Sequence, residues 1–262
     1  MSFSDTFKAQ LPNGMSLPDA FADTFDWLEA QGWAGQLTYH PDPESFARNY
    51  LSIYPPKKME HPNASFVLFS FEAGPPLAQP PKDVKDRFVK LATIAGDGGI
   101  LALWLDEKDA QHFVVFNHGI PHVLTQDPLV ALQFLAIGYP EPAAANPNLT
   151  AEEQALQDGG DPPLLPEAFR SFLEERFDVV IPARASDLGI VVPADDASDP
   201  VRDYLDRFMP EDSSAAAPHI EFSMLGLVPD QPFAITPELR SVLSDAQFDA
   251  IRQAFPYISE EE

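Results

Sequence analysis

The sequence predicts an α+β fold: an antiparallel sheet flanked by helices, with an additional acidic C-terminal region that contains both helices and strands. Three observations predict it. Helix-like segments open the chain, residues 65–125 are rich in apolar segments with a period of two, and a capped apolar helix follows at 127–138. Helices and strands in separate runs are typical of α+β domains.

Two helices are expected before the sheet. In "SLPDAFADTFDWLEAQG", Ser16 can cap a helix whose apolar residues recur at helical spacing, and Gly32 can end it. In "DPESFARNYL" (42–51), Asp42 can act as the cap and Pro43 occupies the first helical turn. We therefore expect helices near 16–32 and over 42–51.

The central run predicts strands that are rich in branched and aromatic residues. The expected strands are 65–72, 87–95, 99–105, 112–117 and 120–125. The four prolines of "GPPLAQPPK" (74–82) predict a loop. Asp127, Pro128 and Gly138 then mark the cap, first turn and end of the helix that closes the run.

A change of composition near residue 142 predicts a domain boundary. Residues 1–142 hold 17 acidic and 9 basic side chains, whereas 143–262 hold 24 acidic side chains and 7 basic ones, all arginine. Residues 143–163 are rich in Pro, Ala and Gly and predict a linker or surface arm, with a helical turn capped by Thr150. A long functional loop inside one domain is the alternative.

The remaining 164–262 predict an acidic C-terminal domain or extension. Apolar stripes indicate helices in "PEAFRSFLEERF", "SDPVRDYLDRFM" and "TPELRSVLSDAQFDAIRQAF", and "VVIP", "GIVV" and "HIEFSMLGLV" are candidate short strands.

The net charge of −25 restricts the classes of partner. Binding to nucleic acid or to an anionic membrane requires Lys or Arg side chains, and the chain has 16 against 41 acids. The absence of Cys excludes disulfides and thiolate zinc sites. The first residues lack the pattern of a signal peptide, and no apolar run is long enough to span a bilayer. We expect a cytoplasmic protein that binds neither nucleic acid nor membrane.

The stretch "GDGG" (96–99) raises the question of a phosphate-binding loop. A P-loop requires "GxxxxGK[ST]", and the Lys and hydroxyl are both missing. A dinucleotide fingerprint lies between a strand and a helix, but here a strand-like segment follows. The glycines therefore predict a sheet corner with positive φ.

The order of these parts resembles the SUKH superfamily, which includes Smi/Knr-like cell-wall regulators and bacterial toxin-immunity proteins. The resemblance covers about residues 16–140. It rests on "LATIAGDGGILALWLDEKDAQHFVVFNHGIPHVLTQDPLVALQFL": a strand, the glycine corner, a strand with Trp104, an acidic turn, a strand ending Asn117-His118-Gly119, and a late helix with Phe134. The loop at 74–82 and the residues after the core domain depart from the family pattern.

Sites of chemistry are weakly indicated. His118 and His122 have the i, i+4 spacing of a zinc site, but Gly119 and Pro121 disfavour the helix that would bring them together. The sequence has no "GxSxG" motif or Cys nucleophile, and the many acids are typical of a solvated surface. We expect no catalytic, cofactor-binding or metal-binding residue.

The resemblance implies a non-catalytic protein-binding module, most simply an immunity-type protein that neutralises a basic toxin or nuclease. The candidate contact residues lie in two turns and a strand: Asp106, Glu107, Asp109, Asn117, His118 and His122. A general SUKH-type interaction protein is the first alternative. An enzyme with a carboxylate and His site between the two halves is the second. The oligomeric state is left open.

Overall fold

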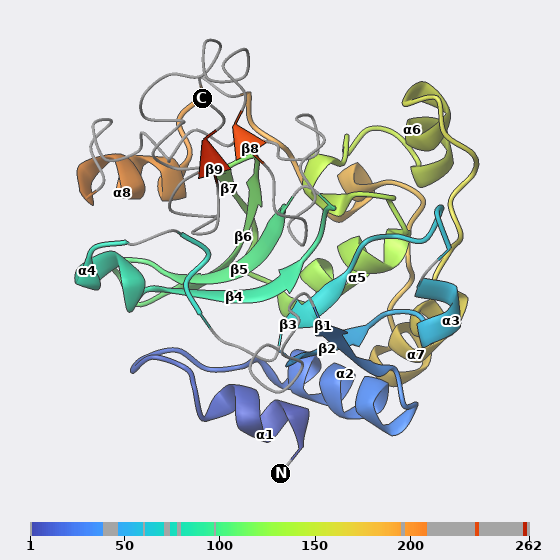
Figure 1. The fold of residues 1–262 in the computed structure, drawn as a ribbon, viewed down its shortest axis with the longest axis horizontal. Coiled ribbons are helices and arrows are strands. Elements are labelled where there is room, and N and C mark those ends of the chain that lie inside the picture. The colour runs from blue at the N-terminus through green and yellow to red at the C-terminus, as the bar shows by residue number, and fades with distance from the viewer. Residues whose placement is uncertain are drawn as a thin grey trace. The chain divides into compact units, whose positions relative to one another are not determined.

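A computed structural model describes residues 2–38, 47–59, 61–70, 74–77, 80–96, 98–194, 197–208, 234–235 and 259–260. Contacts divide the chain into two units, Met1–Phe208 and Met209–Glu262. The first unit has the predicted architecture, an antiparallel sheet flanked by helices (Figure 1).

The sheet has seven strands that follow one another in chain order, and every neighbouring pair is antiparallel. The strands are β1 (Ala34–Thr38), β2 (Ala47–Ser52), β3 (Leu68–Ser70), β4 (Phe88–Thr93), β5 (Ile100–Leu105), β6 (Gln111–Asn117) and β7 (Ile120–Thr125). The last four match the predicted strands closely. Of the strand expected over 65–72, residues 68–70 form β3, residues 65–67 are not in a strand, and residues 71–72 lie outside the described residues.

The helices surround this sheet. They are α1 (Phe3–Lys8), α2 (Asp19–Ala30), α3 (Pro56–Met59), α4 (Lys82–Lys85), α5 (Pro128–Ile137), α6 (Ala151–Gln157), α7 (Glu167–Phe177) and α8 (Pro200–Phe208), with 3-10 turns η1 (Pro142–Ala144) and η2 (Ala185–Leu188). Asp127 caps α5 and Gly138 ends it at φ 92°, as predicted. Thr150 and Glu153 form a capping box on α6, which extends the single predicted turn.

One face of the sheet carries the main core. Phe21 of α2 stacks on Phe113 of β6, with ring centroids 5.1 Å apart, and meets Phe69 of β3 edge-on. Phe25 lies one helical turn further along α2 and contacts Phe3 of α1. Helix α2 therefore buries its aromatic face against the sheet, and α1 packs its aromatic side chains on α2.

The opposite face of the sheet is covered by α8 (Figure 1). Trp104 of β5 is 3 % exposed and lies between Phe88 of β4, 6.1 Å away by ring centroids, and Tyr204 of α8, 5.6 Å away. Because side chains of a strand alternate between faces, Trp104 cannot reach the main core. The sequence of α8 was predicted as a helix, but its position over this aromatic face was not.

Two expectations for the N-terminal part were wrong. Residues 47–51, expected in the second helix, form β2, because pairing with β1 and β3 overrides the local helix signal. Asp42 and Pro43 lie outside the described residues. The helix expected from Ser16 begins at Asp19 after Pro18, and the backbone of Ser16 instead binds the side chain of Gln111.

Residues 143–208 pack on the sheet and belong to the same unit, Met1–Phe208. Tyr54 donates a hydrogen bond to Leu164 O, and Tyr139 donates one to Leu149 O, 2.7 Å away. Phe172 of α7 stacks on Trp27 at 4.3 Å. These contacts fix residues 149–172 on residues 27–139. The composition of the segment does not reveal them, because the partners are distant in the sequence.

The glycine corner is a sheet turn, as predicted, and Gly98 adopts φ 98°. Gly99 has a separate requirement, which is close approach. A Cβ at this position would lie 2.3 Å from Ala143 Cβ and 2.8 Å from Ala95 Cβ. The corner therefore allows η1 to pack against the beginning of β5.

The second unit is described at two short strands, β8 (Ala234–Ile235) and β9 (Ser259–Glu260), which pair in parallel. The helices expected over 236–255 and the strand at 219–228 fall outside the described residues. The candidate strands at 179–182 and 189–192 lie in the first unit and are not strands. Across the described ranges, no helix is long and apolar enough to cross a membrane.

Candidate functional site

The acidic turn between β5 and β6 is held together by Asp106. Its Oδ1 accepts hydrogen bonds from the backbone N–H groups of Lys108 and Ala110, each at 2.8 Å, and its Oδ2 lies 3.0 Å from His112 Nε2. Burial raises the pKa of Asp106, but the hydrogen bonds from His112 and the two amides outweigh it and hold the pKa below its ordinary value. Asp106 therefore has a structural role in the turn.

The other two acids of this turn face arginines. Glu107 receives two hydrogen bonds from Arg207 of α8, at 2.8 and 3.2 Å. Asp109 is 80 % exposed by side chain, and its carboxylate lies 3.8 Å from Arg87. With Lys108 between them, the acids of the turn are balanced locally by basic groups. The turn is therefore a weaker source of negative potential than its sequence indicates.

The second predicted group surrounds the turn between β6 and β7. His118 and Gly119 adopt φ 47° and 81°, the positive values of a tight hairpin turn. Asn117 Oδ1 is buried with no hydrogen-bond partner among the described residues. His122 lies on β7 and is 4 % exposed, so its ring does not reach the surface. The prediction of one turn His and one strand His is confirmed.

The structure does not bring the two groups together. Asp106 precedes β6 and Asn117 ends it, so they lie at opposite ends of the strand. At about 3.4 Å per residue, the turns are separated by roughly 20 Å. The six candidate residues therefore do not form a single contact patch.

Arginine has an internal role throughout the first unit. Every arginine side chain that the structure describes binds a carboxylate or a backbone carbonyl of the same chain. Arg176 binds Asp23, Arg184 binds Glu153, Arg207 binds Glu107, Arg170 binds Ala136 O, Arg202 binds Pro121 O, and Arg87 binds Leu105 O. Four of these six arginines, Arg170, Arg176, Arg202 and Arg207, connect residues 143–208 to the helices, strands and turns before residue 143, so their guanidinium groups stabilise this packing.

Acidic side chains remain exposed on α7. Glu167, Glu175 and Asp178 point to solvent, and none has an ion pair with a described residue. Asp178 ends the helix at φ 54°, and Val180, two residues later, is 78 % exposed. We call Glu167, Glu175, Asp178 and Val180 the α7 surface. It combines unpaired charge with an exposed apolar side chain.

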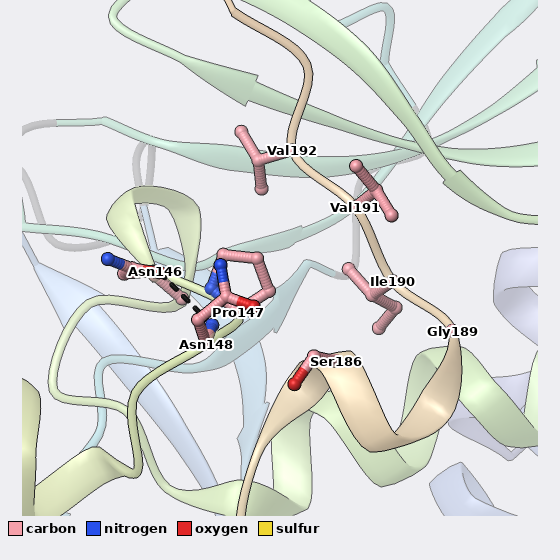
Figure 2. A pocket seen from close by; sticks show the side chains of 9 residues that line it. Asn146, Pro147, Asn148, Ser186, Gly189, Ile190, Val191 and Val192 are labelled. Carbon is pink, nitrogen blue, oxygen red and sulfur yellow. Dashed lines mark hydrogen bonds between the residues drawn. The ribbon is translucent and has the colours of Figure 1, made fainter.

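A pocket of about 390 Å³ lies between two segments of residues 143–208 (Figure 2). One wall is the loop 145–148, and the other comprises Ser186 of η2 and residues 189–192. The bond from Ser186 N to Pro147 O, 2.8 Å long, ties the walls together. The sequence did not predict this pocket, because one wall lies in the predicted linker 143–163 and the other includes "GIVV" (189–192), which was expected to be a strand and is not one.

The pocket lining contains amide, hydroxyl and apolar groups but no side chain that titrates near neutral pH. It can therefore supply hydrogen bonds and apolar contact, not a general acid or base. Across the described ranges, no group of three His, Asp or Glu side chains is arranged to hold a metal ion. Among the described residues, the exposed carboxylates and the pocket are thus the features that can contact a partner or ligand.

Comparison of the chain with protein-family models, with curated proteins and with solved structures gives no match.

Proposed function

We propose that this chain is a non-catalytic protein-binding module of the immunity type, which neutralises a basic toxin in the cytoplasm. The resemblance of residues 16–140 to the SUKH superfamily supports the class of function. The charge of the chain, −25, supports the chemistry of the partner. A nuclease toxin is basic at its substrate groove, so an acidic surface is complementary to the part that must be blocked.

The observation that carries the proposal is the unequal use of the two signs of charge. The described arginines are engaged by carboxylates and carbonyls of their own chain. Acids such as Glu167 and Glu175 are left at the surface without an ion pair among the described residues. A surface of this kind attracts cationic proteins and repels nucleic acids, which accounts for protein rather than phosphate as the partner.

We place the contact on the α7 surface in preference to the acidic turn 106–109. Glu107 is already bound by Arg207, and a basic partner would have to displace that guanidinium. Glu167, Glu175 and Asp178 require no such exchange, and Val180 offers an apolar contact beside them. Exposed pairs contribute only about 0.2–1 kcal/mol each, so several acids would act together, mainly on the rate of association.

Inhibition would follow from occlusion. The acidic surface would accelerate the encounter, and the docked module would cover the toxin's substrate groove. No bond is made or broken in this mechanism, and the exposed carboxylates serve as charges rather than as proton carriers.

The test is capture with the tagged full-length protein from its native cytosol, at low and high salt, followed by co-expression of each captured protein with and without this chain. We expect one basic protein that is lost as salt rises, that arrests growth when expressed alone, and whose toxicity this chain suppresses. A captured protein that is harmless alone would favour the general interaction protein. A chain that suppresses no basic toxin and binds no protein would contradict the proposal.

The contact surface is tested with matched variants. The triple variant E167Q/E175Q/D178N removes three charges from the α7 surface and should reduce the association rate about tenfold at low salt. The triple variant E152Q/D158N/D161N removes three exposed acids on and after α6 and should have a much smaller effect. Equal losses in both would mean that overall charge, and not the α7 surface, determines binding.

A further inference from the structure

We propose that the pocket between the loop 145–148 and residues 189–192 is a docking site for an extended basic segment of a partner protein, which adds as a strand beside Val191 and Val192. This inference rests on the proposed function for the charge of the partner. It adds a second, structurally defined contact that recognises a peptide backbone.

The segment at Val191 and Val192 offers backbone groups for pairing. Neither Val191 nor Val192 has a backbone hydrogen bond to any residue in the described part of the chain. The neighbouring Ile190 N–H is bound to Ala185 O at 3.3 Å, so the segment is fixed at one end. An ordered extended segment with unpaired N–H and C=O groups is the template that strand addition uses.

The pocket walls offer both apolar side chains and amides. Val191 is 73 % exposed and Val192 is 42 % exposed, although both line the pocket. On the facing wall, Asn146 and Asn148 present amides, and Asn146 Oδ1 accepts from Asn148 N at 3.1 Å (Figure 2). An extended peptide fits between these walls because its backbone groups can hydrogen-bond to the amides, and every second side chain can contact the valines.

The segment after Val192 is tied to the sheet by Arg202. Arg202 binds both Pro121 O, at 2.7 Å, and Ala194 O, at 2.8 Å, so one guanidinium joins the beginning of β7 to the segment after Val192. Ile120, next to Pro121, is 39 % exposed. A further exposed apolar side chain therefore lies at the beginning of β7, beside the carbonyl that Arg202 binds.

The occupant's charge follows from its surroundings. Asp187 is exposed beside Ser186 of the pocket wall, and the chain as a whole carries −25. No charged side chain lines the pocket itself. The geometry therefore fits a segment with small apolar residues at its centre and Lys or Arg at its ends.

The probe is the labelled peptide Lys-Thr-Val-Thr-Val-Thr-Val-Lys, blocked at both ends, titrated into the full-length protein with fluorescence anisotropy as the readout. We expect saturable binding to the wild type and at least about a tenfold loss for Val192→Arg. The matched control is Leu156→Arg, which adds the same charge at an exposed apolar residue of α6, outside both the pocket and the α7 surface, and should change affinity by less than about twofold. A peptide N-methylated at alternate residues should not bind, because it lacks the donors for strand addition.

Absence of saturable binding to the wild type would overturn the inference. Equal losses for Val192→Arg and Leu156→Arg, or undiminished binding of the N-methylated peptide, would also overturn it and assign the affinity to overall charge. Self-association of the wild type that Val192→Arg abolishes would identify a second copy as the occupant and would likewise contradict the inference. Each of these results leaves the capture of a basic toxin unaffected, so failure here is distinguishable from failure of the proposed function.

Discussion

His122 of β7 lies close to Asp199 and Arg202 at the beginning of α8. Burial lowers the pKa of this side chain to about 4; Asp199 opposes the change and Arg202 adds to it. Asp199 also accepts a hydrogen bond from Val123 N at 3.1 Å. The imidazole is therefore held neutral at a place where β7 and the beginning of α8 meet.

This pKa predicts a pH dependence of stability. Because the folded pKa lies below the ordinary 6.5, the unfolded chain binds the proton more readily, and the stabilisation present above pH 6.5 is lost as pH falls toward 4. The loss attributable to His122 is about 3 kcal/mol. Urea unfolding of His122→Gln should show a correspondingly smaller change between these pH values. A pH dependence identical to that of wild type, or an equal change in the exposed-turn control His118→Asn, would contradict this assignment.

Gly99 gives a second prediction at this scale. Gly99→Ala places a methyl group 2.3 Å from Ala143 Cβ, and the overpacking should lower the free energy of unfolding by about 1–3 kcal/mol. Gly74→Ala is the control, because a Cβ there has nothing within 4 Å. Chemical denaturation of both variants tests the difference. If Gly99→Ala does not change the free energy of unfolding, η1 can move away at no cost, and the statement that this corner requires close packing would be contradicted.

The sequence could not assign the partners of the candidate site residues. Glu107 and Asp109 were recognisable as turn acids, but their neutralisation depends on Arg207 and Arg87, which are distant in the chain. The pocket was equally hidden, because residues 145–148 and 189–192 have no local motif. Charges and turns can be counted in a sequence, whereas their pairing is a property of the tertiary structure.

At the scale of elements, the helices that were predicted well carry their signals locally. Helix α5 has its cap, its first-turn proline and its terminal glycine within eleven residues of one another. Strand β2 was mistaken for a helix because its conformation is determined by pairing with β1 and β3. Helix α8 was predicted as a helix, but the aromatic face of β4 and β5 that it covers is discernible only once the strands are aligned.

The attachment of α8 is testable at Asp199. Its carboxylate accepts from Val201 N at 3.0 Å, within the first turn of α8, and from Val123 N of β7. Asp199→Ala removes a helix cap and leaves a strand amide without its acceptor, so we expect a loss of about 1–3 kcal/mol. Hydrogen exchange should accelerate at Val123 and across α8. Asp206→Ala, on the exposed side of α8, should be nearly neutral; equal effects of the two variants would contradict the proposed attachment.

At the scale of the molecule, residues 143–208 belong to the sheet unit. Phe169, Leu173 and Ile190 are at most 2 % exposed and join the main core. Burial of each such side chain contributes about 1.5–3 kcal/mol. Loss of several would therefore remove a large part of a free energy of unfolding that is typically about 5–15 kcal/mol.

Truncation tests this conclusion. A chain that ends at residue 142 should lack a cooperative thermal transition, whereas one that ends at residue 208 should retain it, because the core is complete only in the longer chain. Circular dichroism melting and amide dispersion in NMR spectra measure the difference. A cooperative transition of similar Tm in the shorter chain would support the boundary that composition predicted at 142.

We propose that unpaired surface acids of this chain recognise a basic protein. The most direct measurement is the association rate of the captured basic protein with the full-length chain, from about 0.1 M to about 1 M salt, over which the Debye length falls from about 10 to about 3 Å. We predict a steep fall in rate for the wild type and a shallower one for E167Q/E175Q/D178N. A rate that does not change with salt, or a slope that is the same in both proteins, would contradict the claim.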